Sequence, residues 1–168
     1  MLRNGDVVEL EVDAVGPRGE GVGSLEGRRL HVPGLFPGER AAVRISHVDR
    51  QGVRVWADSV EIVRAHPDRA SPPCDRHPDT SYRRGRACDG CAWMSLRPQA
   101  QRALRLEQVR ALGIPAETIE SDAPLGYRAS AKRVAFRDRA GRLRLGSFAR
   151  GSHHGASMLG CRVDHPLI

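Results

Sequence analysis

Several features are scarce or missing in this 168-residue chain, and each absence excludes a class of protein. No apolar run approaches the roughly 20 residues that a membrane-spanning helix needs, so we expect no membrane partner. No apolar leader with a cleavage site follows Met1, which predicts a cytoplasmic chain in reducing surroundings, where disulfides are rare. Aromatic residues make up only 4% of the chain, which limits the surfaces on which nucleic-acid bases could stack.

Lysine is also scarce, although the chain is strongly basic. Of the 27 basic residues only Lys132 is a lysine, and the formal net charge is +7. This charge favours a polyanionic partner, above all nucleic acid, and arginine binds phosphate as a bidentate fork. Codon usage in a GC-rich genome explains the excess of arginine over lysine equally well. Residues 1–65 carry a net charge of −1 and residues 66–168 a net charge of +8, so a polyanion site is expected in the second half.

Cysteine occurs four times, as Cys74, Cys88, Cys91 and Cys161. Cys88 and Cys91 form a Cys-x-x-Cys pair, whose turn brings two thiolates within bonding range of one metal. Four thiolates fit either tetrahedral zinc or a four-iron cluster. The spacing alone leaves three interpretations open, which are zinc, an iron–sulfur cluster, and unbound thiols that include a redox pair at Cys88 and Cys91.

The first 64 residues have the pattern of a small β-barrel. Val8, Leu10 and Val12 alternate with acidic residues, which predicts a half-buried strand. Residues 16–27 are rich in glycine and are interpreted as turns. Further short strands are expected at 29–32, 43–45, 53–57 and 60–63. Several short strands separated by close turns predict a mainly β fold, an antiparallel barrel of the OB type over residues 1–64.

A proline-rich linker is expected at residues 65–73, and a second, α+β part at 74–168. Pro98 suits the first turn of a helix, and Gly113 with Pro115 ends it. We expect a single helix here, followed by an antiparallel hairpin or sheet. The predicted apolar face of the helix consists of Ala103, Leu106, Val109 and Leu112.

The predicted hairpin turns at residues 138–141. Its alternation places Val134, Phe136, Leu143 and Leu145 on an inward face and four arginines on the other. Residues 127–150 hold eight basic groups and one acid, Asp138. We interpret this region as an RNA contact rather than an ordinary solvated face. The candidate RNA-binding residues are Arg128, Lys132, Arg133, Arg137, Arg142 and Arg144.

Three turn motifs in the first part resemble the TRAM domain, a small RNA-binding barrel found in RNA-modifying enzymes. They are Arg18-Gly19-Glu20-Gly21-Val22-Gly23, His31-Val32-Pro33-Gly34 and Pro37-Gly38-Glu39-Arg40.

The whole pattern resembles the N-terminal part of the RNA (uracil-5-)-methyltransferase family, which includes the iron–sulfur 23S rRNA enzymes. Besides the barrel and the cysteines, the motifs are Pro124-Leu125-Gly126-Tyr127-Arg128, Leu145-Gly146 and Arg150-Gly151-Ser152-His153. The resemblance implies that Cys74, Cys88, Cys91 and Cys161 hold a 4Fe-4S cluster, with zinc as the alternative. It also implies an RNA partner, rRNA rather than tRNA, for a monomeric chain.

The family places its catalytic cysteine and its S-adenosylmethionine site on a C-terminal domain. No pattern for such a domain occurs here, and every cysteine is already assigned as a ligand. The resemblance therefore implies a fragment or truncated product without a catalytic residue, inactive alone. The alternative function is a stand-alone zinc-binding protein that binds nucleic acid.

Overall fold

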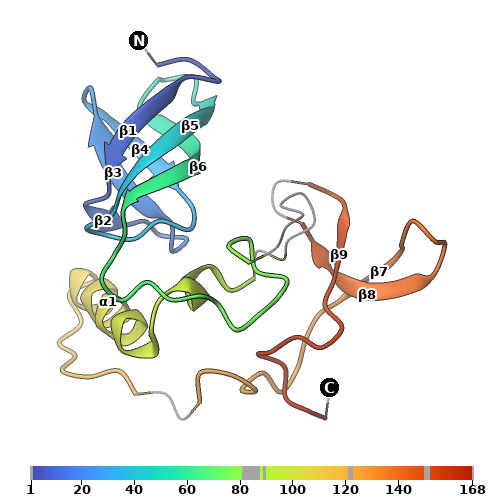
Figure 1. Cartoon of the computed structure of the whole chain (residues 1–168). Coiled ribbons are helices and arrows are strands. Elements are labelled where there is room, and N and C mark those ends of the chain that lie inside the picture. Colours follow the sequence, from blue (N-terminus) through green and yellow to red (C-terminus); the bar gives the residue numbers. More distant parts are fainter. Residues whose placement is uncertain (1, 81–87, 89, 121–122, 150–151, 168) are drawn as a thin grey trace. The chain divides into compact units, whose positions relative to one another are not determined.

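The computed structural model describes residues 2–80, 88, 90–120, 123–149 and 152–167 (Figure 1). Backbone contacts divide the chain into two compact units. The first comprises Met1–Arg69 with Glu107–Ile114, and the second Ala70–Leu106 with Pro115–Ile168. Within the described residues, no helix has the length and apolar character required to cross a membrane.

The first unit is a curled β-sheet with the strand order β1-β5-β6-β4-β3-β2. β4 and β6 run parallel, and the other neighbours are antiparallel. The sheet closes because the chain after β1 returns to β3, where the Asp13 amide donates to the Val22 carbonyl at 2.9 Å. The strands are β1 (Val7–Glu11), β2 (Ala14–Val15), β3 (Gly21–Leu25), β4 (Arg28–Val32), β5 (Arg40–Val48) and β6 (Arg54–Arg64).

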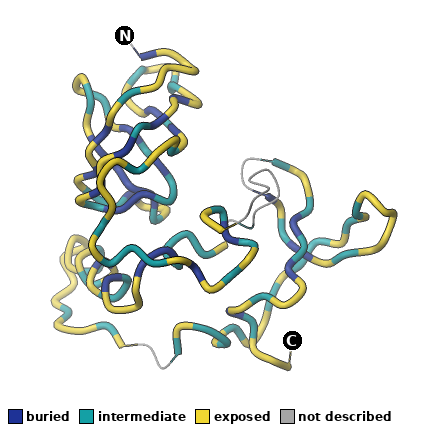
Figure 2. The backbone as a smooth tube through the Cα atoms, in the orientation of Figure 1, coloured by how far each residue is buried: buried dark blue, intermediate teal, exposed yellow. Residues whose placement is uncertain are grey.

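Alternate side chains of these strands fill the barrel core. Leu10 and Val12 are buried, as their alternation predicts, and Leu30, Val43 and Val55 meet them from β4, β5 and β6. Figure 2 shows buried (dark blue) and exposed (yellow) stretches of backbone interspersed along the strands of this unit. The predicted mainly β fold with an N-terminal barrel is therefore confirmed.

The strand limits differ from the sequence prediction in two places. Residues 21–25, interpreted as turns, form strand β3. Glycine is needed there for close approach, since a Cβ on Gly21 would lie 2.6 Å from the Leu35 carbonyl oxygen and one on Gly23 would lie 2.1 Å from that of Glu11. The expected strands at 53–57 and 60–63 are one continuous strand, β6, because no turn interrupts them.

The second unit contains helices and a small sheet. The short 3-10 helix η2 (Ala92–Ser95) precedes α1 (Pro98–Ala111), whose first part belongs to this unit. The sheet consists of β7 (Val134–Arg137), β8 (Leu143–Phe148) and β9 (Gly155–Ser157), all antiparallel. This confirms the predicted helix followed by a hairpin.

The predicted apolar face of the helix is wrong in part, because Leu106 and Val109 are half-buried but Ala103 is exposed. The buried residues of α1 are Ala100 and Leu104, whereas Leu112 lies beyond its end and is 77% exposed. The hydrophobic residues of this helix fit two stripes at helical spacing, and periodicity alone cannot choose between them.

The predicted inward face of the hairpin is also wrong. Leu143 lies opposite Arg137 and Leu145 opposite Ala135, so the two leucines share a face with these residues rather than with Phe136. Both leucines are exposed, while Phe136 lies opposite Arg144. The turn length sets this register, and a slip of one residue moves every side chain of a strand to the other face.

Candidate metal centre and basic hairpin

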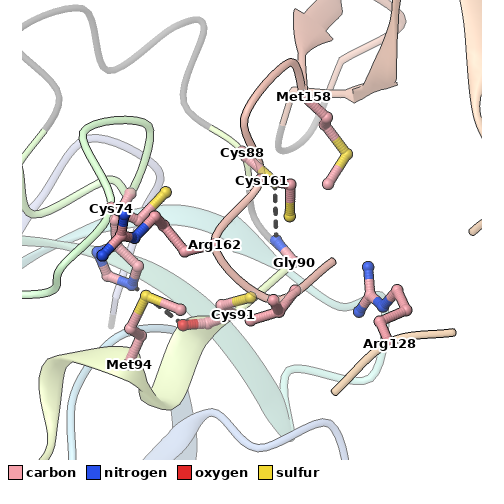
Figure 3. A pocket seen from close by; sticks show the side chains of 11 residues that line it. Cys74, Cys88, Gly90, Cys91, Met94, Arg128, Met158, Cys161 and Arg162 are labelled. Atoms are coloured by element: carbon pink, nitrogen blue, oxygen red, sulfur yellow. Dashed lines mark hydrogen bonds between the residues drawn. The ribbon is translucent and has the colours of Figure 1, made fainter. Parts of the chain in front are cut away.

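The four cysteines of the chain line one cavity in the second unit. Cys74 comes from the loop after β6, Cys88 and Cys91 from the turn before η2, and Cys161 from the turn after β9 (Figure 3). None of them forms a disulfide. Other residues that line the cavity are His77, Gly90, Met94, Arg128, Met158, Arg162 and Val163. Segments far apart in the sequence thus present sulfur atoms to a common space.

The backbone carbonyls of Cys74 and Cys91 are both hydrogen-bonded to His77. The His77 amide donates to the Cys74 carbonyl at 3.2 Å, and its ring Nε2 lies 3.2 Å from the Cys91 carbonyl oxygen. The Asp79 amide donates to the ring Nδ1, so Nε2 carries the hydrogen and is the donor. His77 is only 4% exposed. One buried histidine therefore connects two cysteine-bearing segments, through its backbone amide and its ring.

Cys88 and Cys161 are positioned by the sheet and its following turn. The Cys88 amide donates to the Arg76 carbonyl at 2.9 Å, and Cys88 forms an isolated bridge with Ala149 next to the end of β8. The Gly90 amide lies 3.4 Å from the Cys88 sulfur and donates to it. The Cys161 amide donates to the Met158 carbonyl at 3.1 Å. Asp89, between Cys88 and Gly90, lies outside the described residues.

The thiols are close enough to influence one another electrostatically. Burial raises the pKa of the Cys91 thiol to about 11, and the neighbouring Cys88, Cys161 and Cys74 act in the same direction. The Arg128 guanidinium opposes them. Burial disfavours the thiolate more strongly than Arg128 favours it, so Cys91 holds its proton near neutral pH. Metal binding at this cavity would therefore release protons.

Four thiols that line one cavity form a donor set that suits either a single tetrahedral zinc ion or an iron–sulfur cluster. Tetrahedral zinc with Zn–S bonds of about 2.3 Å requires sulfur atoms about 4 Å apart. Within the described part of the chain, no three His, Cys, Asp or Glu side chains are arranged to hold a metal ion. Ligands of an iron–sulfur cluster stand farther apart because irons and sulfides lie between them. The donor set of four thiols fits such a cluster.

The candidate RNA-binding residues do not form one open face. Arg133 forms an ion pair with Asp164 and is mostly buried. Arg142 and Arg144 both pair with Asp138, at 3.2 and 2.9 Å. Arg137 donates to the Gly141 carbonyl at 2.8 Å, Arg128 lines the cysteine cavity, and Lys132 is exposed. Arg150 and Gly151 of the motif at 150–153 lie outside the described residues.

Asp138 organises the hairpin turn in a way that the charge count did not anticipate. Its Oδ1 accepts from the amides of Ala140 and Arg142, and its Oδ2 accepts from the side chains of Arg142 and Arg144. The hydrogen bond from Arg144 and the other donors lower the pKa of Asp138 to about 2. Two of the predicted RNA contacts therefore also stabilise the turn.

Sequence reasoning missed His77, Met158 and Arg162 as residues of the cysteine cavity. His77 lies in a polar, proline-rich segment, where periodicity gives no signal. Met158 and Arg162 could have been expected near Cys161 from their position in the sequence alone.

Comparison with known proteins identifies the barrel. Residues 2–54 match the TRAM domain, so the first unit contains a TRAM domain, as its turn motifs predicted. The chain is 30% identical, over 99% of its length, to an uncharacterized RNA methyltransferase of Geobacter sulfurreducens. It is 32% identical, over 95% of its length, to the 23S rRNA (uracil(1939)-C(5))-methyltransferase RlmD of Halomonas elongata. In each case it covers 33% of the relative.

A solved structure has a similar fold. This is the tRNA (uracil-54, C5)-methyltransferase of Pyrococcus abyssi in complex with S-adenosyl-L-homocysteine, with a TM-score of 0.55 and 22% identity. The match covers 94% of this chain and 33% of the Pyrococcus protein. The chain thus spans about a third of the length of the relatives that it matches.

Proposed function

We propose that this chain is the RNA-recognition and cluster-bearing portion of an RNA (uracil-5-)-methyltransferase. The TRAM domain and the homologues named RNA methyltransferase, aligned along nearly the whole chain, support an RNA-binding role in this kind of enzyme. Methyl transfer from S-adenosylmethionine would then require the part of the enzyme that corresponds to the other two thirds of the relatives. We assign no catalytic residue to the chain itself.

The observation that carries the proposal is the convergence of all four cysteines on one cavity. We assign Cys74, Cys88, Cys91 and Cys161 as ligands of a 4Fe-4S cluster. Bound there, the cluster would supply a covalent cross-link between distant segments of the second unit. The guanidinium groups of Arg128 and Arg162 border the same cavity and would offset the negative charge that four thiolates bring.

The basic second half provides the second part of the proposed function, which is contact with RNA. At the hairpin turn Asp138 neutralises one of its two paired arginines, and Arg137, Arg139 and Lys132 are exposed nearby. Several guanidinium groups of this hairpin could contact the phosphates of an RNA strand that lies along it. We propose rRNA rather than tRNA as the substrate, in a cytoplasmic and monomeric protein.

Anaerobic purification tests the cluster. We expect a brown protein with a sulfur-to-iron absorption band and about four irons and four sulfides per chain. Replacing Cys161→Ser should abolish the band, whereas the matched variant Ser157→Ala, four residues earlier, should retain it. A colourless protein with one zinc per chain would contradict the iron–sulfur assignment and favour the zinc-binding alternative.

Binding of single-stranded rRNA fragments tests the RNA part of the proposal. Affinity should fall steeply with salt, because each neutralised phosphate releases counterions. If the chain with its cluster bound does not bind RNA at low salt, the proposed RNA contact is refuted.

A further inference from the structure

The outer face of the TRAM barrel carries a row of aromatic rings across three neighbouring strands. Trp56 on β6 lies beside His31 on β4 and opposite His47 on β5. Paired residues on adjacent strands share a face, and the buried neighbours Leu30 and Val55 point the other way, into the core. Arg18 lies over the Trp56 ring. These four residues, Arg18, His31, His47 and Trp56, are called the Trp56 shelf below.

Two rings of the shelf, His31 and Trp56, are already in contact, tilted relative to each other. The ring centroids of His31 and Trp56 are 4.7 Å apart with an interplanar angle of 35°. The Arg18 guanidinium carbon lies 5.6 Å from the Trp56 centroid, within the range of a cation–π contact. Arg18 and His47 are exposed, and Trp56 is partly exposed. An exposed arginine can leave the ring at little cost, which opens the face of Trp56.

A buried carboxylate holds the shelf in place. Glu20 is only 3% exposed, and its Oε1 lies 2.8 Å from His31 Nδ1. Its Oε2 accepts the Arg18 amide, also at 2.8 Å. Gly16 leaves room for this carboxylate, since a Cβ there would lie 2.4 Å from Glu20 Oε1. Glu20 thus fixes both the His31 ring and the backbone from which Arg18 extends, so the shelf is preorganised before any ligand binds.

Positive charge borders the aromatic row on the same face. Arg29 and Arg54 lie two residues before His31 and Trp56, opposite each other on β4 and β6. Residues two apart in a strand share a face, so these arginines belong beside the shelf. Arg29 pairs with Asp13 at 3.3 Å, but both side chains are about half exposed, and such pairs are weak. The barrel is close to neutral as a whole, but three of its arginines, Arg18, Arg29 and Arg54, lie on the face that carries Trp56.

We propose that the Trp56 shelf stacks one unpaired base of single-stranded RNA. The base would take the face of Trp56 that Arg18 now covers, and Arg18 would move to the adjacent phosphate, with Arg29 and Arg54 beside the strand. Barrel domains bind single strands through aromatic platforms next to a basic groove, and every base offers a ring to stack. This inference rests on the proposed RNA binding and names the contact that the barrel makes.

Trp56 fluorescence gives a direct test. The chain has two tryptophans, so Trp93→Phe leaves Trp56 as the only one. The Trp93→Phe chain, with its cluster bound, is titrated with a single-stranded RNA oligonucleotide. We expect the emission of Trp56 to be quenched. An oligonucleotide of equal length with abasic sites should bind without this quenching. Equal quenching by both would overturn the inference, because the shelf would then sense the backbone and not a base.

Substitutions test the energetic weight of the shelf. Trp56→Ala should weaken RNA binding about ten-fold, the scale expected for loss of one base–aromatic stack. Trp56→Phe should retain much of the affinity. Arg18→Ala should weaken binding and reduce the salt slope by about 1, as expected for one phosphate contact. Val63→Ala, an exposed position on the same strand, is the matched control and should change neither.

The outcomes separate this inference from the function on which it rests. Suppose that the wild-type chain binds RNA, that the Trp56 substitutions leave its affinity unchanged, and that RNA with bases quenches Trp56 no more than abasic RNA does. The proposed base stacking on the shelf is then refuted, while RNA binding stands. If the wild-type chain binds no RNA, the proposed function itself fails. Circular dichroism of each variant checks the fold. Should Trp56→Ala unfold, Trp56→Phe and the comparison with abasic RNA still decide.

Discussion

Glu39 and Arg69 form a buried, bidentate ion pair that fastens the segment after β6 to the barrel. Arg69 Nε donates to Glu39 Oε1 at 2.7 Å, and Arg69 Nη2 donates to Glu39 Oε2 at 2.8 Å. Glu39 is fully buried and also accepts the amides of Phe36 and His66. The Arg69 guanidinium lies 5.0 Å from the centre of the Phe36 ring. The compact first unit therefore extends to Arg69.

Removal of Arg69 should strongly destabilise the barrel. Arg69→Ala leaves the Glu39 charge buried without its cation, and breaking such a pair costs about 3–5 kcal/mol. Urea unfolding of the Trp93→Phe chain, followed by Trp56 fluorescence, measures this loss. Arg64→Ala is the matched control, because Arg64 pairs with Glu11 at 2.6 Å on the exposed surface, where a pair contributes about 1 kcal/mol or less. If the two variants lose the same free energy of unfolding, the Glu39–Arg69 pair does not stabilise the barrel as a buried ion pair.

His77 should determine how firmly the proposed cluster is held. His77→Ala removes the ring hydrogen bond to the Cys91 carbonyl, and loss of such an outer contact typically lowers metal affinity about 10–100-fold. We expect the visible absorption band to decay faster when a chelator is added. His154→Ala, an exposed histidine of the same unit, should decay at the wild-type rate. Indistinguishable decay of all three proteins would show that His77 does not support the ligands.

The hairpin prediction needs a different set of substitutions from the one that the sequence suggests. Arg133 is unsuitable because it pairs with Asp164, whose Oδ1 is buried without a hydrogen-bond partner, so its loss would disturb the fold. The triple variant Lys132→Ala, Arg137→Ala and Arg142→Ala keeps that pair. If all three side chains contact phosphate, RNA affinity falls and the salt slope decreases by about 3. Arg102→Ala on α1 is the control, and an unchanged slope in the triple variant would exclude the hairpin as the contact surface.

The hairpin turn should remain ordered in moderately acidic solution. Because the Arg144 hydrogen bond lowers the pKa of Asp138 to about 2, from 3.8, the contribution of its carboxylate is present above pH 3.8 and is lost as pH falls through about 2. Amide exchange at Arg142, measured by NMR, reports this turn. We expect protection at pH 5 and its loss near pH 2. In Asp138→Ala the protection should already be low at pH 7, and persistence there would argue against the role of this carboxylate.

The convergence of the four cysteines on one cavity could be predicted from the sequence because cysteine is scarce. With only four in the chain, the long-range partner of the Cys88–Cys91 pair had few candidates, and Cys161 does line the same cavity. The barrel could be predicted for a different reason, because the alternation of apolar and polar residues in β1 and β5 matches the alternation of buried and exposed side chains. The ligand set itself stays a prediction.

The faces of the hairpin and of α1 could not be predicted, because each depends on a partner that the sequence does not show. The hairpin alternation is compatible with two registers, and the turn around Asp138 selects the one that exposes Leu143 and Leu145. Gly21 and Gly23 gave the signal of a turn but serve close strand packing. The Trp56 shelf was missed because low aromatic content says nothing about where the few rings gather.

The wide separation in sequence of Cys74 and Cys161 has a consequence for how the protein matures. The barrel has its own apolar core and can form as soon as it leaves the ribosome, whereas the described residues of the second unit include few large buried side chains. Closing so long a loop costs entropy that this small core offsets poorly, so an inorganic cross-link would complete the unit. Under iron starvation, cells would then accumulate a partly folded chain, in which the barrel resists proteases and the second unit is protease-sensitive.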